Sequence, residues 1–69
     1  MWVEEKITLN EYEFAILYSD QITKLVHKID VYQAESSRFN NRSLKISHQE
    51  LRGITREEAI KWVSNTRRG

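Results

Sequence analysis

The feature that most constrains this chain is its shortage of residues that break or crosslink a fold. Its 69 residues include no proline, no cysteine and only two glycines. Turn-rich β proteins use Gly, Pro and Asn at many positions, so this scarcity predicts a few long elements, chiefly helices. A core of this size is marginal without disulfides or a metal. We therefore expect stability to come from helix packing or from self-association.

Three helix starts are predicted by capping boxes, in which a Ser or Thr is followed three residues later by Glu. The boxes begin at Thr8, Ser47 and Thr55, and an isoleucine precedes each of them. An apolar residue in that place commonly packs onto the first turn of the helix that follows. The pattern predicts helices that begin near residues 9, 48 and 56.

The first of these helices is expected to be long. Apolar residues recur at intervals of three and four through the first half of the chain, which is the spacing of one helix face. They are Leu9, Tyr12, Ile16, Ile22, Val26, Ile29 and Tyr32. A helix over 9–36 would measure about 40 Å, more than a globule of this length can cover. We expect it either to break near Ser19-Asp20 or to pack against a second copy, which predicts a homodimer.

Two shorter helices are expected after a loop near 37–43. A helix over 48–52 would end at Gly53, a residue suited to a left-handed cap. A last helix is expected over 56–66, followed by a flexible basic tail at 66–69. The predicted fold class is therefore mainly α.

Alternating polar and apolar residues mark two segments that do not fit a helix. They are 3–7 and 42–47, and the alternation indicates short extended pieces that pair beside the helices. The sequence thus allows a small two-stranded β element within one domain that covers residues 1–69.

Charge is distributed unevenly along the chain. Residues 1–34 carry three lysines against six acidic residues, whereas residues 35–69 carry eight basic residues against four acidic ones. A basic half is a candidate footprint for an anionic partner such as nucleic acid. The alternative is an acidic surface of the same chain or of a second copy. The candidate contacts to phosphates or to an acidic partner are Arg42, Lys45, Arg52, Arg56, Lys61 and Arg67.

The parts of an enzyme active site are missing from the sequence. It has no glycine-containing nucleophile elbow, phosphate loop or dinucleotide motif. His27 and His48 have no metal-binding motif around them; His27 is expected to be a partly exposed helix residue and His48 to begin the second helix. We therefore predict no catalytic activity, cofactor or metal.

The cellular location is inferred from what the chain lacks. No apolar run approaches the roughly 18 residues of a membrane span. Residues 1–5 carry acids where a secretory signal carries basic residues. We expect no membrane segment and a cytoplasmic protein.

Two functions are compatible with these features. The first is a small regulatory protein that binds a protein partner through helical surfaces. Phe14, Tyr18 and Leu25 lie off the main apolar stripe of the first helix, so they are the candidate interface residues.

The alternative is a DNA- or RNA-binding regulator with a helix-turn-helix-like corner over 47–66. Gly53 would form the tight turn, and the helix that begins at Arg56 would enter the groove. Glu57 and Glu58 count against this alternative because they would face phosphates at the start of that helix. Affinity for nucleic acid that falls steeply with salt would separate the two functions.

Overall fold

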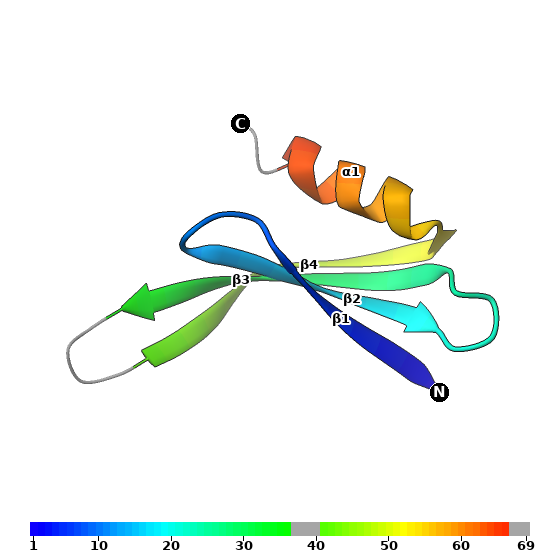
Figure 1. Cartoon of the computed structure of the whole chain (residues 1–69), viewed down its shortest axis with the longest axis horizontal. Coiled ribbons are helices and arrows are strands. Elements are labelled where there is room, and N and C mark those ends of the chain that lie inside the picture. The colour runs from blue at the N-terminus through cyan, green and yellow to red at the C-terminus, as the bar shows by residue number, and fades with distance from the viewer. Residues whose placement is uncertain (37–40, 67–69) are drawn as a thin grey trace.

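The protein is mainly β, and the predicted mainly α class is wrong. The structure, a computed structural model, describes residues 1–36 and 41–66. These residues form a four-stranded antiparallel sheet followed by one helix (Figure 1). The elements are β1 (Trp2–Thr8), β2 (Glu13–Asp20), β3 (Val26–Ser36), β4 (Asn41–Ile54) and α1 (Arg56–Thr66).

The strands follow one another in space in the same order as in the chain. β1 pairs with β2, β2 with β3, and β3 with β4, always antiparallel. The two segments that were expected to be extended, 3–7 and 42–47, are both strands. They lie at opposite edges of the sheet and pair with β2 and β3 instead of with each other.

Asparagine and aspartate form two turns of the sheet, although the scarcity of glycine and proline predicted helices. The Asn10 side-chain oxygen accepts hydrogen bonds from the N–H groups of Tyr12 and Glu13 at 2.8 and 2.9 Å. The Asp20 carboxylate accepts from the N–H groups of Ile22 and Thr23, both at 2.8 Å. Such side chains replace a backbone turn, so two hairpins form here without proline or glycine.

The predicted helix over 9–36 is wrong because this region forms β2 and β3, in which buried apolar residues recur at every second position. Ala15 and Leu17 in β2, and Ile29 and Val31 in β3, are each at most 1% exposed. They oppose one another in register, Ala15 with Val31 and Leu17 with Ile29, so all four point to the same face. The spacing of three and four in the apolar residues was coincidental, and the homodimer predicted along that helix loses its basis.

The core lies between this face of the sheet and α1 (Figure 1). Ala59 and Val63, one helical turn apart, are at most 1% exposed and pack on the sheet. The Thr55 hydroxyl accepts a hydrogen bond from the Glu58 N–H at 3.2 Å, as an N-cap does. The helix predicted over 56–66 is therefore confirmed. The buried apolar residues are Ala15, Leu17, Val26, Ile29, Val31, Ala59 and Val63.

The short helix predicted over 48–52 is wrong, since these residues belong to β4. Gly53 lies inside the strand with a φ of 116°, so it does not cap a helix. The helix-turn-helix-like corner over 47–66 is wrong for the same reason. Among the described residues α1 is the only helix, so the helical surfaces predicted for partner binding do not form.

The remaining predictions concern the loop, the tail and the membrane. Residues 37–40 of the expected loop and 67–69 of the expected tail lie outside the described residues, and β4 already begins at Asn41. Within residues 1–36 and 41–66, no helix has the length and apolar character needed to cross a bilayer.

Candidate functional site

The face of the sheet opposite α1, here called the open face, carries most of the aromatic and titratable side chains of the strands. Residues alternate between the two faces along each strand, and residues opposite each other in register share a face. The buried residues of the face that meets α1 therefore identify which side chains lie on the open face. The open face comprises Trp2, Glu4, Lys6, Thr8, Phe14, Ile16, Tyr18, Lys28, Asp30, Tyr32, Lys45, His48 and Glu50.

Two aromatic rings stack across β2 and β3 on the open face. Phe14 and Tyr32 are register partners, and their ring centroids lie 5.3 Å apart with an interplanar angle of 14°. The Lys6 ammonium lies 4.6 Å from the centre of the Phe14 ring, a cation–π distance. The result is a stacked aromatic pair, here called the Phe14–Tyr32 platform, with a positive charge over one of its two rings.

A second aromatic–cation pair lies further along the same two strands. The Lys28 ammonium is 4.1 Å from the centre of the Tyr18 ring, and the two residues are register partners. Loss of solvation raises the pKa of Tyr18 to about 12, and the negative charge of Asp30 adds to the shift. The Tyr18 hydroxyl is therefore protonated at neutral pH.

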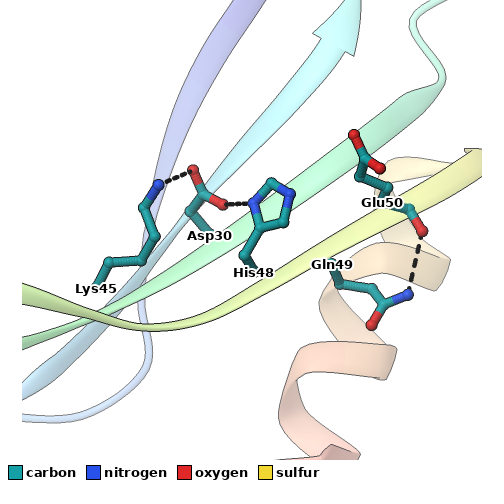
Figure 2. A network of polar contacts seen from close by, with 5 residues as sticks. All are labelled: Asp30, Lys45, His48, Gln49 and Glu50. Atoms are coloured by element: carbon teal, nitrogen blue, oxygen red, sulfur yellow. Dashed lines mark hydrogen bonds and ion pairs between the residues drawn. The ribbon is translucent and has the colours of Figure 1, made fainter.

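A buried carboxylate occupies the middle of the open face. Asp30 is 1% exposed, and its two oxygens meet His48 Nδ1 at 2.6 Å and Lys45 Nζ at 3.5 Å (Figure 2). Burial alone would raise the pKa of Asp30. The hydrogen bond from His48 and the positive charge of Lys45 outweigh burial, and the pKa of this carboxyl lies below its usual value.

The Asp30 contact also determines how His48 presents its ring. A carboxylate only accepts hydrogen bonds, so Nδ1 carries the hydrogen and a neutral ring keeps Nε2 as an acceptor. Figure 2 shows Asp30, Lys45 and His48 together, with Gln49 on the other side of the β3–β4 ladder. His48 was expected at a helix start; it lies instead opposite Asp30 in a strand pair.

A pocket opens at the end of this face where β1 begins. It has a volume of about 450 Å³ and is lined by Trp2, Tyr18, His27, Lys28, Glu50 and Leu51. The rings of Trp2 and His27 lie 5.3 Å apart at 60°. His27 pairs in register with neither β2 nor β4, because a bulge separates Val26 from Lys28. This bulge turns the His27 ring toward Trp2.

The basic residues expected to contact a partner do not gather on one surface. Lys45 is on the open face beside Asp30, whereas Lys61 is exposed on α1. Arg56 begins α1 and donates to both Glu5 carboxylate oxygens, with three distances of 2.7 to 2.9 Å. This ion pair lowers the pKa of Glu5 and raises that of Arg56. Arg42 and Arg52 are exposed in β4, and Arg67 lies outside the described residues.

Each ion pair in the described part of the chain joins its acidic first half to its basic second half. The pairs are Lys45–Asp30, His48–Asp30 and Arg56–Glu5. Part of the basic half therefore pairs with acidic residues of the same chain. This is the alternative to an anionic partner that the sequence analysis gave.

Two of the three predicted interface residues, Phe14 and Tyr18, lie on the open face. Leu25 precedes β3 and is half-buried. Sequence reasoning missed the residues that complete the face, chiefly Trp2, Lys6, Lys28, Asp30, Tyr32 and His48. Alternation was the signal for them: Phe14-x-Ile16-x-Tyr18 and Lys28-x-Asp30-x-Tyr32 both have the period of a strand.

No group of three or more His, Asp or Glu side chains in residues 1–36 and 41–66 is placed to hold a metal ion.

Comparison of the chain with protein-family models, with curated proteins and with solved structures gave no match.

Proposed function

We propose that this protein binds single-stranded nucleic acid on the open face. The observation that carries the proposal is the alternation of aromatic rings with lysines on the side of the four-stranded sheet that no described element covers. Unpaired bases stack on aromatic side chains, and lysines meet the phosphates between them. A duplex hides its bases in the stack, so this geometry favours a single strand.

The Phe14–Tyr32 platform is the centre of the proposed surface. Both rings are partly exposed. Lys6 lies over the Phe14 ring, so a base would stack on Tyr32, over which no cation lies among the described residues. Lys6 and Lys45 flank the pair on the neighbouring strands. Stacking on aromatic rings is worth about 1–3 kcal/mol per base and tolerates any base. The platform thus supports binding without strong sequence preference.

The charges of the open face indicate that stacking contributes more than phosphate contacts. Lys6, Lys28 and Lys45 supply the positive charge, Asp30 pairs with Lys45, and Glu4 and Glu50 offset part of the rest. For a single strand, each phosphate that the protein neutralises makes the slope of log affinity against log salt more negative by about 0.7. With Lys45 paired to Asp30, two lysines remain for phosphates, and the expected slope is about −1.4. A basic groove with many phosphate contacts would be steeper.

Fluorescence anisotropy with labelled strands of about 15 nucleotides tests the proposal. We expect the Phe14→Leu/Tyr32→Leu variant to bind about tenfold or more weakly, because leucine keeps the apolar volume but not the flat ring. Lys6→Ala should weaken binding moderately. Lys61→Ala is the matched control, since Lys61 is exposed on α1 on the other side of the sheet, and it should bind as the native protein does.

The proposal fails if no single strand binds at about 50 mM salt, where phosphate contacts are strongest. It also fails if a duplex of the same sequence binds as tightly as the single strand. Unchanged affinity in the folded Phe14→Leu/Tyr32→Leu variant would show that these rings only stabilise the sheet.

A further inference from the structure

We infer that the pocket beside Trp2 receives a guanine base of the bound strand. The inference rests on the proposed function and adds a base preference to it. The pocket volume of about 450 Å³ falls in the range of about 300–1,000 Å³ typical of ligand sites. It shares Tyr18 and Lys28 with the open face, so a strand on the Phe14–Tyr32 platform reaches it without leaving the sheet.

Stacking in the pocket comes from Trp2. The residue is 56% exposed although its ring touches His27, so indole surface remains for a base. Tyr18 lies four residues from Phe14 along β2, a separation of about 14 Å. The two stacking places are thus far enough apart for different nucleotides of one strand.

The hydrogen-bonding groups of the pocket select among bases. Lys28 and Glu50 are register partners and both line the pocket, so an ammonium donor and a carboxylate acceptor border the same space. The Watson–Crick edge of guanine offers the matching set: the O6 acceptor beside the N1–H and N2–H donors. Adenine and cytosine each place a ring-nitrogen acceptor where guanine has its N1–H donor, and uracil or thymine has one donor between two acceptors. Guanine alone has two adjacent donors for a carboxylate.

Both polar groups are available for a ligand. Among the described residues, the Glu50 carboxylate takes part in no ion pair, whereas those of Glu5 and Asp30 do. The side-chain amide of Gln49 donates to the backbone oxygen of Glu50 at 3.1 Å and leaves its carboxylate untouched. Lys28 is held over the Tyr18 ring at 4.1 Å, a contact that keeps its ammonium at the pocket while leaving its hydrogens free to donate.

Strands of thymidine with one central G, A, C or inosine test the inference by anisotropy. We expect the G strand to bind at least fivefold more tightly than the A and C strands, the discrimination of a good bidentate contact. Inosine lacks the N2 amino group and should fall in between. Glu50→Gln should bring the G and A strands within about twofold while leaving the all-T strand unchanged.

Glu57→Gln is the matched control, because Glu57 is an exposed acid on α1, and it should keep the full preference for G. A second readout uses Trp62→Phe, which leaves Trp2 as the only tryptophan. The G strand should then quench the Trp2 fluorescence more than the A strand does.

The failures of the two proposals are distinguishable. Equal affinity for the G and A strands in the native protein overturns the guanine site while the proposed function stands. A preference for G that persists in Glu50→Gln also overturns the guanine site and leaves the proposed function standing. If no strand binds at all, the proposed function itself is wrong.

Discussion

The buried Asp30 carboxylate makes His48 more important for stability than its exposure suggests. His48 is 45% exposed, but its Nδ1 lies 2.6 Å from a carboxylate that is 1% exposed. In His48→Ala the Asp30 charge stays buried and loses its shortest ion pair, while Lys45 remains at 3.5 Å. A buried charge that loses a partner is costly, so this variant should be clearly destabilised.

The expected magnitude follows from the kind of hydrogen bond that is lost. A bond to a charged group contributes about 1.5–3 kcal/mol, and the exposure of His48 indicates the lower end. A loss of about 1.5 kcal/mol in a domain of this size lowers Tm by about 6–12 °C. Asp30→Asn should cost less, about 1 kcal/mol or below, because the amide oxygen still accepts from His48 and the buried charge is removed.

The pH dependence gives an independent check. The pKa of Asp30 is lowered in the folded state, so its contribution to stability is full above the unfolded pKa of about 3.9. The contribution is lost as pH falls through the lower, folded pKa. Asp30→Asn removes this loss. The acid-induced decrease in stability should therefore be shallower in that variant than in the native protein.

Urea denaturation of the native protein, both single variants and the double variant measures the coupling between Asp30 and His48. We expect a coupling energy of about 1 kcal/mol or more at neutral pH. A value below about 0.3 kcal/mol, the error of additivity for independent sites, would show that the two side chains act independently. A greater loss of stability in Asp30→Asn than in His48→Ala would equally contradict the role assigned to the buried charge.

Three further predictions concern the fold. Gly53→Ala should destabilise by about 1–3 kcal/mol, because φ is 116° and a Cβ would lie 3.0 Å from the His27 ring; an unchanged Tm would contradict this. Leu17→Ala should cost about 2.7–5 kcal/mol in urea denaturation, whereas Ile22→Ala, at an 88% exposed position, should stay within about 0.5 kcal/mol; similar losses would dispute the assigned core. Asn10→Ala should lower the stability of the first hairpin by about 1 kcal/mol, and unaltered hydrogen exchange there would argue against the side-chain turn.

The misassigned first half shows why a local pattern was insufficient. The box that begins at Thr8 has the residues of a helix start, but the chain uses Asn10 to turn back on itself. A side-chain hydrogen bond of this kind competes with the helix for the same N–H groups. Whether the turn or the helix forms depends on the pairing of β2 with β1 and β3. Such long-range pairing cannot be predicted from a window of five residues.

The box at Thr55 was interpreted correctly because more than one signal agreed. The hydroxyl caps the helix, Glu57 and Glu58 stand in its first turn, and Ala59 and Val63 supply a buried stripe. Local preference and tertiary packing point the same way at this place.

For the open face, alternation in the sequence predicts only which side chains of one strand lie on the same side. The contacts between strands depend on register, which bulges shift between Val31 and Tyr32 and between Val26 and Lys28. Without the shift between Val31 and Tyr32, Ser47 would stand opposite Asp30 instead of His48. A non-local ladder of this kind leaves no local trace in the sequence, so the buried carboxylate and its partners were not predicted.

The position of β4 at an edge of the sheet places several basic residues of the second half of the chain along that edge. β4 is the longest strand and forms an edge of the sheet, where unpaired backbone groups invite another strand. Arg42, Lys45 and Arg52 are exposed along it. Two copies that met edge to edge here would bring like charges together, and a bulge interrupts the ladder besides. Exposed arginine and lysine side chains disfavour the addition of a second strand at such an edge.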